Sequence, residues 1–269
     1  MRVSRDISVE KGDLLLRQAS GPDEVLACQQ LRYRIFYDEL GATPVGDMAS
    51  RRMDVDRFDA ICDHLLVVKR GASATGDVIY LRDGELIGTY RLLRQEVAEA
   101  CGGFYTQAEF DIAPLIAAHP GLRFLELGRS CVLRPYRTKP VVELLWQGIW
   151  NYVRAHRLDV MLGCASLEGT EPGAHALSLS FLATAAAPPE WAVRAHDSHR
   201  IEMRGLPHGG IDTRRALKQL PPLVKGYLRL GCYIGDGAVI DRQFNTIDVL
   251  VILPVSVIHP RYFAHFGAP

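Results

Sequence analysis

Apolar residues along the first half of the chain recur with two different periods, which predicts strands alternating with helices. Short apolar runs typical of buried strands occupy residues 14–16, 64–68 and 85–93. Between the first two runs, apolar residues return at helical spacing after Gly21-Pro22 and two acidic residues, a pattern that favours a helix start. We expect this helix to end at Gly41, and the polar residues 42–63 to form a long functional or disordered loop.

The second half continues this alternation and then changes character. Residues 123–133 and 160–165 have the pattern of strands, the segment from Pro140 that of a helix capped by Thr138, and residues 173–187 that of a further helix. The last third carries Pro-Pro pairs at 188–189 and 221–222, a basic helical stretch at 213–230 and a strand at 247–253. No linker precedes it. We therefore predict one α/β domain over residues 1–269, with a core at about 12–187 and a C-terminal elaboration at about 188–269 packed on it.

Composition narrows the class of protein. The 269 residues contain 31 Lys or Arg and 31 Asp or Glu, so the basic excess of a nucleic-acid-binding protein is absent. The six cysteines lie 30 or more residues apart, without zinc-site spacing, and indicate reduced thiols rather than a metal site or a disulfide scaffold. The start has no apolar signal region, and the apolar run 249–258 is shorter than the roughly 20 residues of a membrane span. We expect a cytoplasmic protein that at most lies on a membrane surface.

Two segments before the middle of the chain carry candidate chemistry. Arg32 precedes Phe36 by four residues, which places both on one helix face; alone, this pair is also what a surface arginine beside a core aromatic looks like. The loop that follows contains Asp54, Asp56 and Asp59. Its spacing lacks the third ligand and the glycine of a calcium loop. A solvated acidic loop and a site for a substrate ammonium group both remain open.

The sequence Glu126-Leu-Gly-Arg129 lies within an apolar strand. Two charges buried there are costly unless each finds a partner, so they form either a structural ion pair or part of a site. Residues three apart in a strand face opposite sides, unless a bulge re-aims one of them, and Gly128 is where a bulge would fall.

A basic passage joins that strand to the next helix. Arg134, Arg137 and Lys139 precede the helix N-terminus, where backbone N–H groups and cations together suit a phosphate; a solvated basic loop is the alternative. The chain has no GxSxG, no GxGxxG opening a βαβ unit and no HExxH, which disfavours hydrolases, dehydrogenases and metalloproteases.

Taken in order, these motifs resemble the GNAT acyltransferase superfamily. The sequence Gly88-Thr-Tyr-Arg91, between the acidic loop and Glu126-Leu-Gly-Arg129, is part of the resemblance. The pattern is shared by two acyl-carrier-protein-dependent families, the acyl-homoserine-lactone synthases and the L-ornithine Nα-acyltransferases. Seven segments look like the ornithine family: 31–41, 62–66, 103–105, 126–131, 145–148, 163–166 and 220–231. The synthases have a tryptophan where this chain has Ala42, which favours the ornithine family.

The resemblance implies a GNAT-like fold, with a mixed central sheet whose strands splay and are flanked by helices. It implies Glu126 and Arg129 as the catalytic residues, with Glu126 as the base. It also implies that Asp56 and Asp59 hold substrate ammonium groups and that an arginine holds its carboxylate. The substrate-binding set is Arg32, Phe36, Asp56, Asp59 and Arg91.

The acyl donor expected from this resemblance is acyl-carrier protein, with no bound cofactor and no metal. The usual Q/R-x-x-G-x-G/A phosphate motif is degenerate at residues 134–139, which suits a phosphopantetheine arm better than coenzyme A. An acidic carrier needs a basic landing area, and residues 123–139 and 200–230 both carry a basic excess. The expected phosphopantetheine and carrier contacts are Arg134, Arg137, Lys139, Arg214, Arg215 and Lys218.

The expected reaction transfers a (3-hydroxy)fatty acyl group to the α-amine of L-ornithine and gives lyso-ornithine lipid. Alternatives within enzymes are acylation of glycine or lysine, or acyl-homoserine-lactone synthesis. From another class, the chain could be a non-catalytic module that binds a carrier or an anionic membrane. We expect no nucleic-acid partner.

Overall fold

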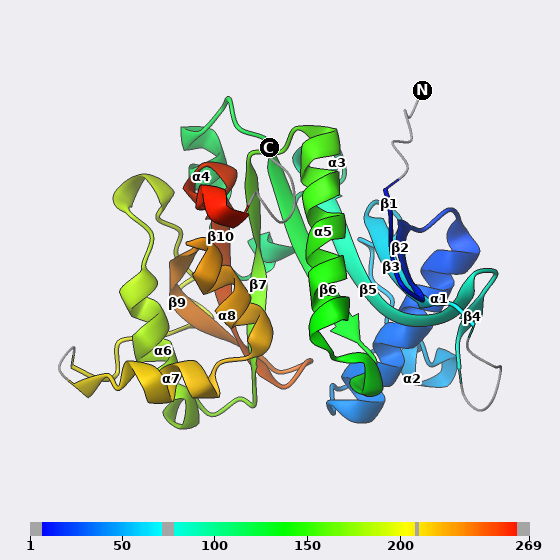
Figure 1. Ribbon diagram of the computed structural model, residues 1–269. Coiled ribbons are helices and arrows are strands. Elements are labelled where there is room, and N and C mark those ends of the chain that lie inside the picture. Colours follow the sequence, from blue (N-terminus) through cyan, green and yellow to red (C-terminus); the bar gives the residue numbers. More distant parts are fainter. Residues whose placement is uncertain (1–6, 72–77, 208–209, 263–269) are drawn as a thin grey trace. The chain divides into compact units, whose positions relative to one another are not determined.

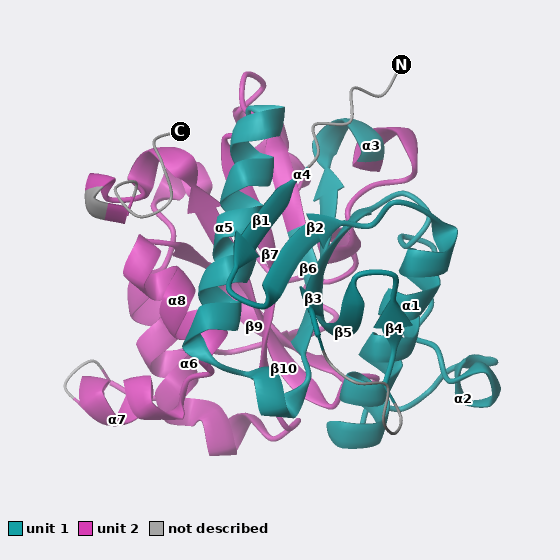
Figure 2. Cartoon of the chain, turned by 45° about the vertical axis from the view of Figure 1, so that its right-hand side comes forward, with its two compact units in different colours: residues 1–97, 127–157 teal, residues 98–126, 158–269 magenta. Residues whose placement is uncertain are grey.

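The computed structural model describes residues 7–71, 78–207 and 210–262. The chain divides into two compact units: unit 1 comprises residues 1–97 and 127–157, and unit 2 comprises residues 98–126 and 158–269 (Figure 2). Strand β6 (Phe124–Val132) contributes its first three residues to unit 2 and the rest to unit 1. Among the described residues, no helix combines the length and apolar character needed to cross a membrane.

Unit 1 is a sheet with strand order β1-β2-β3-β5-β6, in which β1 pairs with β2, β2 with β3 and β3 with β5 in antiparallel fashion. The strands other than β6 are β1 (Ser8–Lys11), β2 (Leu14–Gln18), β3 (Asp63–Lys69), β5 (Gly84–Arg94) and the short β4 (Tyr80–Leu81), which pairs with β5. The predicted strands at 14–16, 64–68 and 85–93 are therefore confirmed.

Helices cover both faces of this sheet. Helix α5 (Lys139–His156) packs across β1, β2 and β3, while α1 (Pro22–Tyr33) contacts β3 and β5 from the other side (Figure 1). Helix α5 begins beside Thr138 as predicted, although the threonine side chain makes no capping hydrogen bond. Helix α1 passes without a break into a π-helical turn, Arg34–Glu39, which Leu40 caps. Gly41 follows with φ +75°, so the predicted end of the helical segment is confirmed, while the widened last turn was not predicted. The loop after it contains only the four-residue helix α2 (Met48–Arg51).

Unit 2 is a mixed sheet in which β6, at Phe124–Glu126, pairs in parallel with β7 (Val160–Glu168). The order continues through β10 (Thr246–Pro254) and β9 (Tyr233–Asp241) to the short β8 (Arg200–Ile201), all antiparallel. Because β10 pairs with β7, the residues after 188 supply strands to this sheet. Strands at 123–133, 160–165 and 247–253 are confirmed; β9, which carries Gly235 and Gly237, was not predicted.

The helices of unit 2 are short. They are α4 (Ala113–Ala118), α6 (Ala176–Leu182), α7 (Thr213–Gln219) and α8 (Pro222–Leu230). Helix α3 (Gln95–Ala100) lies where the chain leaves unit 1. The basic stretch 213–230, predicted as one helical segment, is divided at Pro221, because proline cannot continue a helix from the preceding turn. The predicted helix at 173–187 is α6 with a 3-10 turn at each end.

Candidate active site

Arg32 lies at the centre of a buried cluster of charges in unit 1. Its side chain, on α1, is 1% exposed. Nε donates to Oδ2 of Asp54 at 2.7 Å, and Nη2 donates to both oxygens of Asp59 at 2.8 Å. Burial opposes the charge on Arg32, but Asp54 and Asp59 outweigh it and raise the pKa of the guanidinium. Arg32 is therefore an interior cation rather than a surface arginine beside Phe36.

Two further arginines complete the cluster. Arg91, on β5, donates from Nη1 to Asp56 at 2.6 Å and to Asp59 at 3.2 Å. Arg129, on β6, reaches Asp54 from Nε at 3.3 Å and Asp56 from Nη2 at 3.4 Å. Three guanidinium groups thus meet three carboxylates, which balances charge in a place where an unpaired charge is costly. We name these six residues, Arg32, Asp54, Asp56, Asp59, Arg91 and Arg129, the charge cluster.

The acidic loop is folded inwards by its own short-range bonds. The Asp56 carboxylate accepts a hydrogen bond from the Phe58 backbone N–H at 2.8 Å, and the Phe58 ring is buried. Burial opposes ionisation of Asp59, but Arg32 and Arg91 outweigh it, and the pKa of this carboxyl is lowered to about 2. Of the two readings left open by the sequence, the fully solvated acidic loop is excluded.

Arg129 has an unusual backbone conformation. Its φ is +50°, a left-handed value that costs a non-glycine residue about 1 kcal/mol or more. Gly128, where the sequence predicted a bulge, does not adopt positive φ. The irregularity therefore falls one residue later, on the functional candidate itself. A strained backbone persists only where surrounding contacts stabilise it, as the contacts of Arg129 with Asp54 and Asp56 do here. Such strain is concentrated at functional sites.

Glu126, in unit 2, is anchored by backbone donors. Its side chain is buried; Oε1 accepts from the Thr106 N–H at 2.7 Å and Oε2 from the Tyr105 N–H at 3.0 Å. The donors come from a 3-10 turn that starts at Tyr105. Gly103 precedes that turn at φ +97°, and a Cβ there would collide with the side chain of Gln107. Two N–H donors suit an ionised carboxylate, which is an acceptor only.

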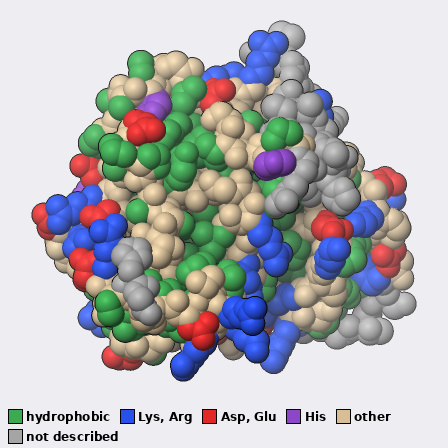
Figure 3. Space-filling model, turned by 60° about the vertical axis from the view of Figure 1, so that its left-hand side comes forward, with side chains coloured by type: hydrophobic (Ala, Val, Ile, Leu, Met, Phe, Trp, Pro, Cys, Tyr) green, Lys and Arg blue, Asp and Glu red, His purple; other side chains and the backbone are tan. Residues whose placement is uncertain are grey.

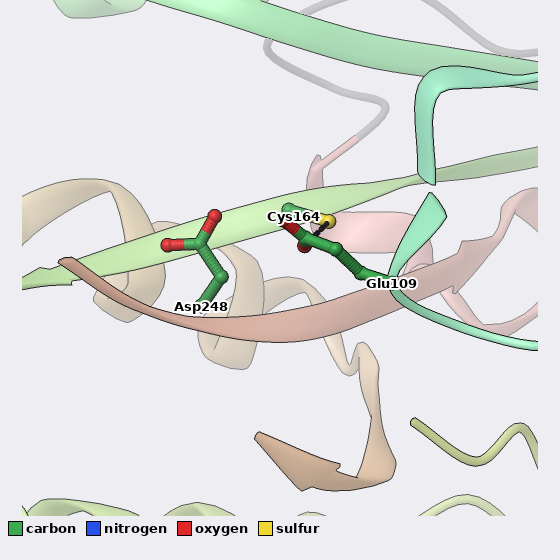
Figure 4. A group of neighbouring side chains, drawn as sticks. All are labelled: Glu109, Cys164 and Asp248. Atoms are coloured by element: carbon green, nitrogen blue, oxygen red, sulfur yellow. Dashed lines mark hydrogen bonds between the residues drawn. The ribbon is translucent and has the colours of Figure 1, made fainter. Parts of the chain in front are cut away.

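A second acidic group in unit 2 was not predicted. Glu109, Cys164 and Asp248 bring their ligand atoms within 4.8 Å of one another (Figure 4). The Cys164 thiol donates to Oε2 of Glu109 at 3.2 Å, and Asp248 accepts from the Thr246 hydroxyl at 2.8 Å. Burial and both carboxylates raise the pKa of the Cys164 thiol well above its ordinary value.

The basic residues predicted to meet the acyl donor are exposed. Arg137 donates to both oxygens of Glu39 at 2.6 and 3.0 Å, and Lys139 lies 3.5 Å from Glu143. Arg134 occupies the 3-10 turn before α5. In unit 2, Arg214, Arg215 and Lys218 all belong to α7 and are exposed. Lys and Arg side chains gather over the lower part of the face shown in Figure 3.

Residues that the site prediction omitted include Asp54, Tyr37 and His64. Asp54 is 2% exposed and accepts a hydrogen bond from the Tyr37 hydroxyl at 3.0 Å. His64 is buried with Nε2 3.1 Å from the carbonyl oxygen of Asp59; burial lowers the pKa of its imidazole. The spacing of Asp54 within the acidic loop was visible, but the burial that distinguishes it was not. Phe36 lies half-buried in the π-helical turn.

The matches to known proteins agree with this architecture. The sequence profile of the acetyltransferase (GNAT) domain family matches residues 31–147, a range that holds the whole charge cluster. The chain is 51% identical over 257 residues to an L-ornithine N(alpha)-acyltransferase of Agrobacterium fabrum, with 95% of this chain and 86% of the relative covered. It is 48% identical over 264 residues to an enzyme of the same name from Rhizobium meliloti, with 98% and 87% covered.

The profile match identifies residues 31–147, which include the charge cluster, as a domain of the GNAT acetyltransferase class. Within that class, the chain belongs to the family of L-ornithine N(alpha)-acyltransferases. Among solved structures, an N-acyl amino acid synthase from uncultured soil microbes, FeeM, aligns over 90% of this chain and 91% of its own at 12% identity and a TM-score of 0.48. The resemblance drawn from the sequence motifs is confirmed at the level of the family.

Proposed function

We propose that this enzyme transfers a fatty acyl or 3-hydroxyacyl group to the α-amine of L-ornithine and so forms lyso-ornithine lipid. The observation that carries the proposal is the identity of about one residue in two, over 95% of the chain, with a relative named for ornithine Nα-acylation. The proposed chemistry is direct transfer without an acyl-enzyme. The amine nitrogen attacks the thioester carbonyl carbon, the tetrahedral intermediate collapses, and the donor leaves as a thiolate that takes up a proton.

Glu126 is the proposed base. An amine attacks only as the neutral form, so a proton must leave the ammonium before or during attack. Both oxygens of Glu126 accept backbone N–H groups, which favours the ionised carboxylate a base requires, and each oxygen has a second lone pair. The carboxylate takes the proton directly or through a water. Backbone N–H groups near Arg129 to Val132 would stabilise the charge on the thioester oxygen.

The charge cluster is proposed to hold the amino acid. Asp56 and Arg129 are its more exposed members, with side chains 20% and 12% exposed, and they suit the ammonium and the carboxylate of the substrate. The side chains of the remaining predicted residues, Arg32, Asp59 and Arg91, are 5% exposed or less. Their proposed role is to hold Asp56 and Arg129 in position. Phe36, half-buried on the π-helical turn, would supply apolar contact to the substrate.

The acyl donor is proposed to be acyl-carrier protein. Arg134, Arg137 and Lys139 would meet the single phosphate of the phosphopantetheine arm near the start of α5. The exposed cations of α7, Arg214, Arg215 and Lys218, would meet the acidic carrier itself. We place the enzyme in the cytoplasm, with peripheral contact to the inner face of an anionic membrane, where its amphiphilic product belongs.

The test is a reconstituted reaction followed by mass spectrometry. Purified enzyme is incubated with 3-hydroxyacyl-carrier protein and L-ornithine, L-lysine or glycine, and the Glu126→Gln variant serves as the matched control. We expect Nα-acylornithine as the main product, with acyl-coenzyme A a poor donor. Product from glycine or lysine but not from ornithine would overturn the amino-acid assignment. Equal rates from acyl-coenzyme A would overturn the carrier assignment, and the absence of any acylated product would favour a binding module.

A further inference from the structure

The π-helical turn at Arg34–Glu39 places one hydroxyl group against the charge cluster. π-helical turns are rare, and those that occur inside α-helices are frequently found at functional sites. In this turn Leu40 N–H bonds to the Ile35 carbonyl at 3.0 Å, the i→i+5 pattern. The Tyr37 ring stacks on Tyr33 with centroids 4.8 Å apart and planes 11° apart. The stack fixes the ring, so the position of the Tyr37 hydroxyl is set by the helix and not by a mobile side chain.

That hydroxyl is directed at Asp54. Its oxygen lies 3.0 Å from Oδ1 of Asp54 and 3.4 Å from the sulfur of Met48. A hydroxyl has one proton, and a carboxylate is the stronger acceptor, so the proton belongs to the bond with Asp54. The other carboxylate oxygen, Oδ2, faces Arg32 at 2.7 Å and Arg129 at 3.3 Å. Asp54 therefore connects the π-helical turn to the guanidinium group of Arg129.

Of the three arginines in the charge cluster, Arg129 is the most accessible to a solute. Its side chain is 12% exposed, against 1% for Arg32 and 4% for Arg91. Its backbone is held at φ +50°, so neighbouring contacts rather than intrinsic preference determine where the guanidinium points. A planar guanidinium binds a carboxylate well only when it is oriented for two parallel bonds.

We infer that Tyr37 is a positioning residue: its hydroxyl fixes Asp54, which orients Arg129 to bind the carboxylate of the amino-acid substrate. The inference rests on the proposed N-acylation of an amino acid and names the specificity contact of that site. A change at Tyr37 should weaken recognition of the carboxylate and leave the acyl donor's own binding unchanged.

The experiment compares Tyr37→Phe with Tyr33→Phe. Both changes delete one hydroxyl from the same stacked, buried ring pair, but only Tyr37 is bonded to Asp54. KM is measured for L-ornithine, for L-ornithinamide, which lacks the carboxylate charge, and for the acyl donor. We expect Tyr37→Phe to raise KM for ornithine about tenfold, the loss typical of a bond to a charged group, and to leave KM for ornithinamide and the donor unchanged. Tyr33→Phe should match the parent enzyme.

A second variant keeps the inference testable if Tyr37→Phe is poorly folded. Arg129→Lys retains the charge but loses the planar fork, and it should give the same selective rise in KM for ornithine. In the double variant the two effects should not add, because both act on one contact. An equal rise in KM for ornithine and ornithinamide, or additive effects, would overturn the inference. Lack of ornithine acylation by the parent enzyme would instead overturn the proposed function.

Discussion

Arg32 and Asp59 form a two-bond contact from a single nitrogen: Nη2 lies 2.8 Å from each carboxylate oxygen, with both side chains buried. Removing one member of such a pair leaves the other as a buried charge without full compensation, which typically costs about 3–5 kcal/mol. The contact joins α1 to the acidic loop, which is also bonded to α1 through the Asp54 N–H and the Gln29 carbonyl at 3.0 Å. It therefore holds the loop in the fold as well as shaping the site.

The pH dependence of unfolding should show this contact. The folded pKa of Asp59, about 2, lies below its ordinary value of 3.8, so its stabilising effect is present above pH 4 and is lost as the pH falls towards 2. Denaturant unfolding at pH 7, 4 and 2.5 should show Asp59→Asn less stable than the parent by about 3 kcal/mol at pH 7, with the difference shrinking at pH 2.5.

The matched control for this measurement is Asp47→Asn. Asp47 pairs with Arg51 on the exposed helix α2, and exposed pairs contribute about 0–1 kcal/mol. Its stability curve should follow that of the parent across the whole range. Parallel curves for Asp59→Asn and the parent would show that Asp59 is not the group whose protonation destabilises the protein.

The apolar pattern predicted the strands whose apolar runs are continuous. It did not predict β9 or the π-helical turn, which depend on contacts with other segments of the chain. Continuous apolar runs make six strands recognisable in the sequence: β2, β3, β5, β6, β7 and β10. β9 is interrupted by Gly235 and Gly237; a Cβ at Gly235 would make a tight contact of 3.0 Å with that of Leu250. The π-helical turn has the same local sequence pattern as a continuing α-helix, so nothing in it predicts the wider turn.

The resemblance predicted five members of the charge cluster, which come from four separate segments, but nothing in the sequence predicted the second acidic group. Arg32, Asp56, Asp59, Arg91 and Arg129 do lie in one cluster, although their contact with substrate stays a prediction. Glu109, Cys164 and Asp248 come from three distant segments, and only the pairing of β7 with β10 brings the last two near each other. No spacing rule links residues so far apart along the chain.

Replacing Glu126 tests the proposed base. Glu126→Gln keeps the shape but removes the basic oxygen, so kcat should fall by about 100-fold or more, the usual contribution of a general base. The pH profile of kcat/KM should also lose its acidic limb. The control is Glu168→Gln, at an exposed glutamate on β7, which should leave kcat and the pH profile unchanged. Full turnover with an unchanged pH profile would remove Glu126 from the mechanism.

Reversing charge on α7 tests the carrier contact. Arg214 and Arg215 are exposed and adjacent, so Arg214→Glu/Arg215→Glu should lower kcat/KM for the acyl carrier about tenfold or more at low salt. The two enzymes should converge as salt screens the interaction. Arg154→Glu, exposed on α5, is the control. An unchanged rate with unchanged salt sensitivity would exclude α7 as the landing area; sedimentation with anionic vesicles would then show whether it contacts lipid instead.

Direct transfer predicts that no thiol is essential. Burial and two nearby carboxylates keep Cys164 protonated, and a thiol is a poor nucleophile in that form. Cys164→Ala should therefore retain turnover within about threefold, and mass spectrometry of the enzyme after reaction with acyl donor alone should show no added acyl group. Iodoacetamide should label the exposed Cys101 before Cys164. An acyl adduct on Cys164 together with loss of activity in Cys164→Ala would replace direct transfer by a covalent route.

The close packing of α5 on β2 at Gly148 predicts a steric effect on stability. A Cβ built on Gly148 would lie 2.6 Å from Cδ1 and 3.1 Å from Cγ of Leu16, a side chain that is completely buried. Alanine favours a helix interior over glycine by about 1 kcal/mol, but overpacking a rigid core typically costs about 1–3 kcal/mol. We expect the steric cost to win, because the buried Leu16 side chain has little room to turn aside.

Gly148→Ala should accordingly lower the free energy of unfolding, measured by urea denaturation, by about 1–2 kcal/mol. Leu16→Ala should also destabilise the protein, because it leaves a cavity under α5. The double variant should be more stable than the sum of the two losses predicts, since the new methyl group then occupies space that Leu16 has vacated. Gly121→Ala, where no atom lies within 4 Å of the added Cβ and φ is not positive, is the control for added volume. Simple additivity would mean that α5 shifts away from β2 to accommodate alanine.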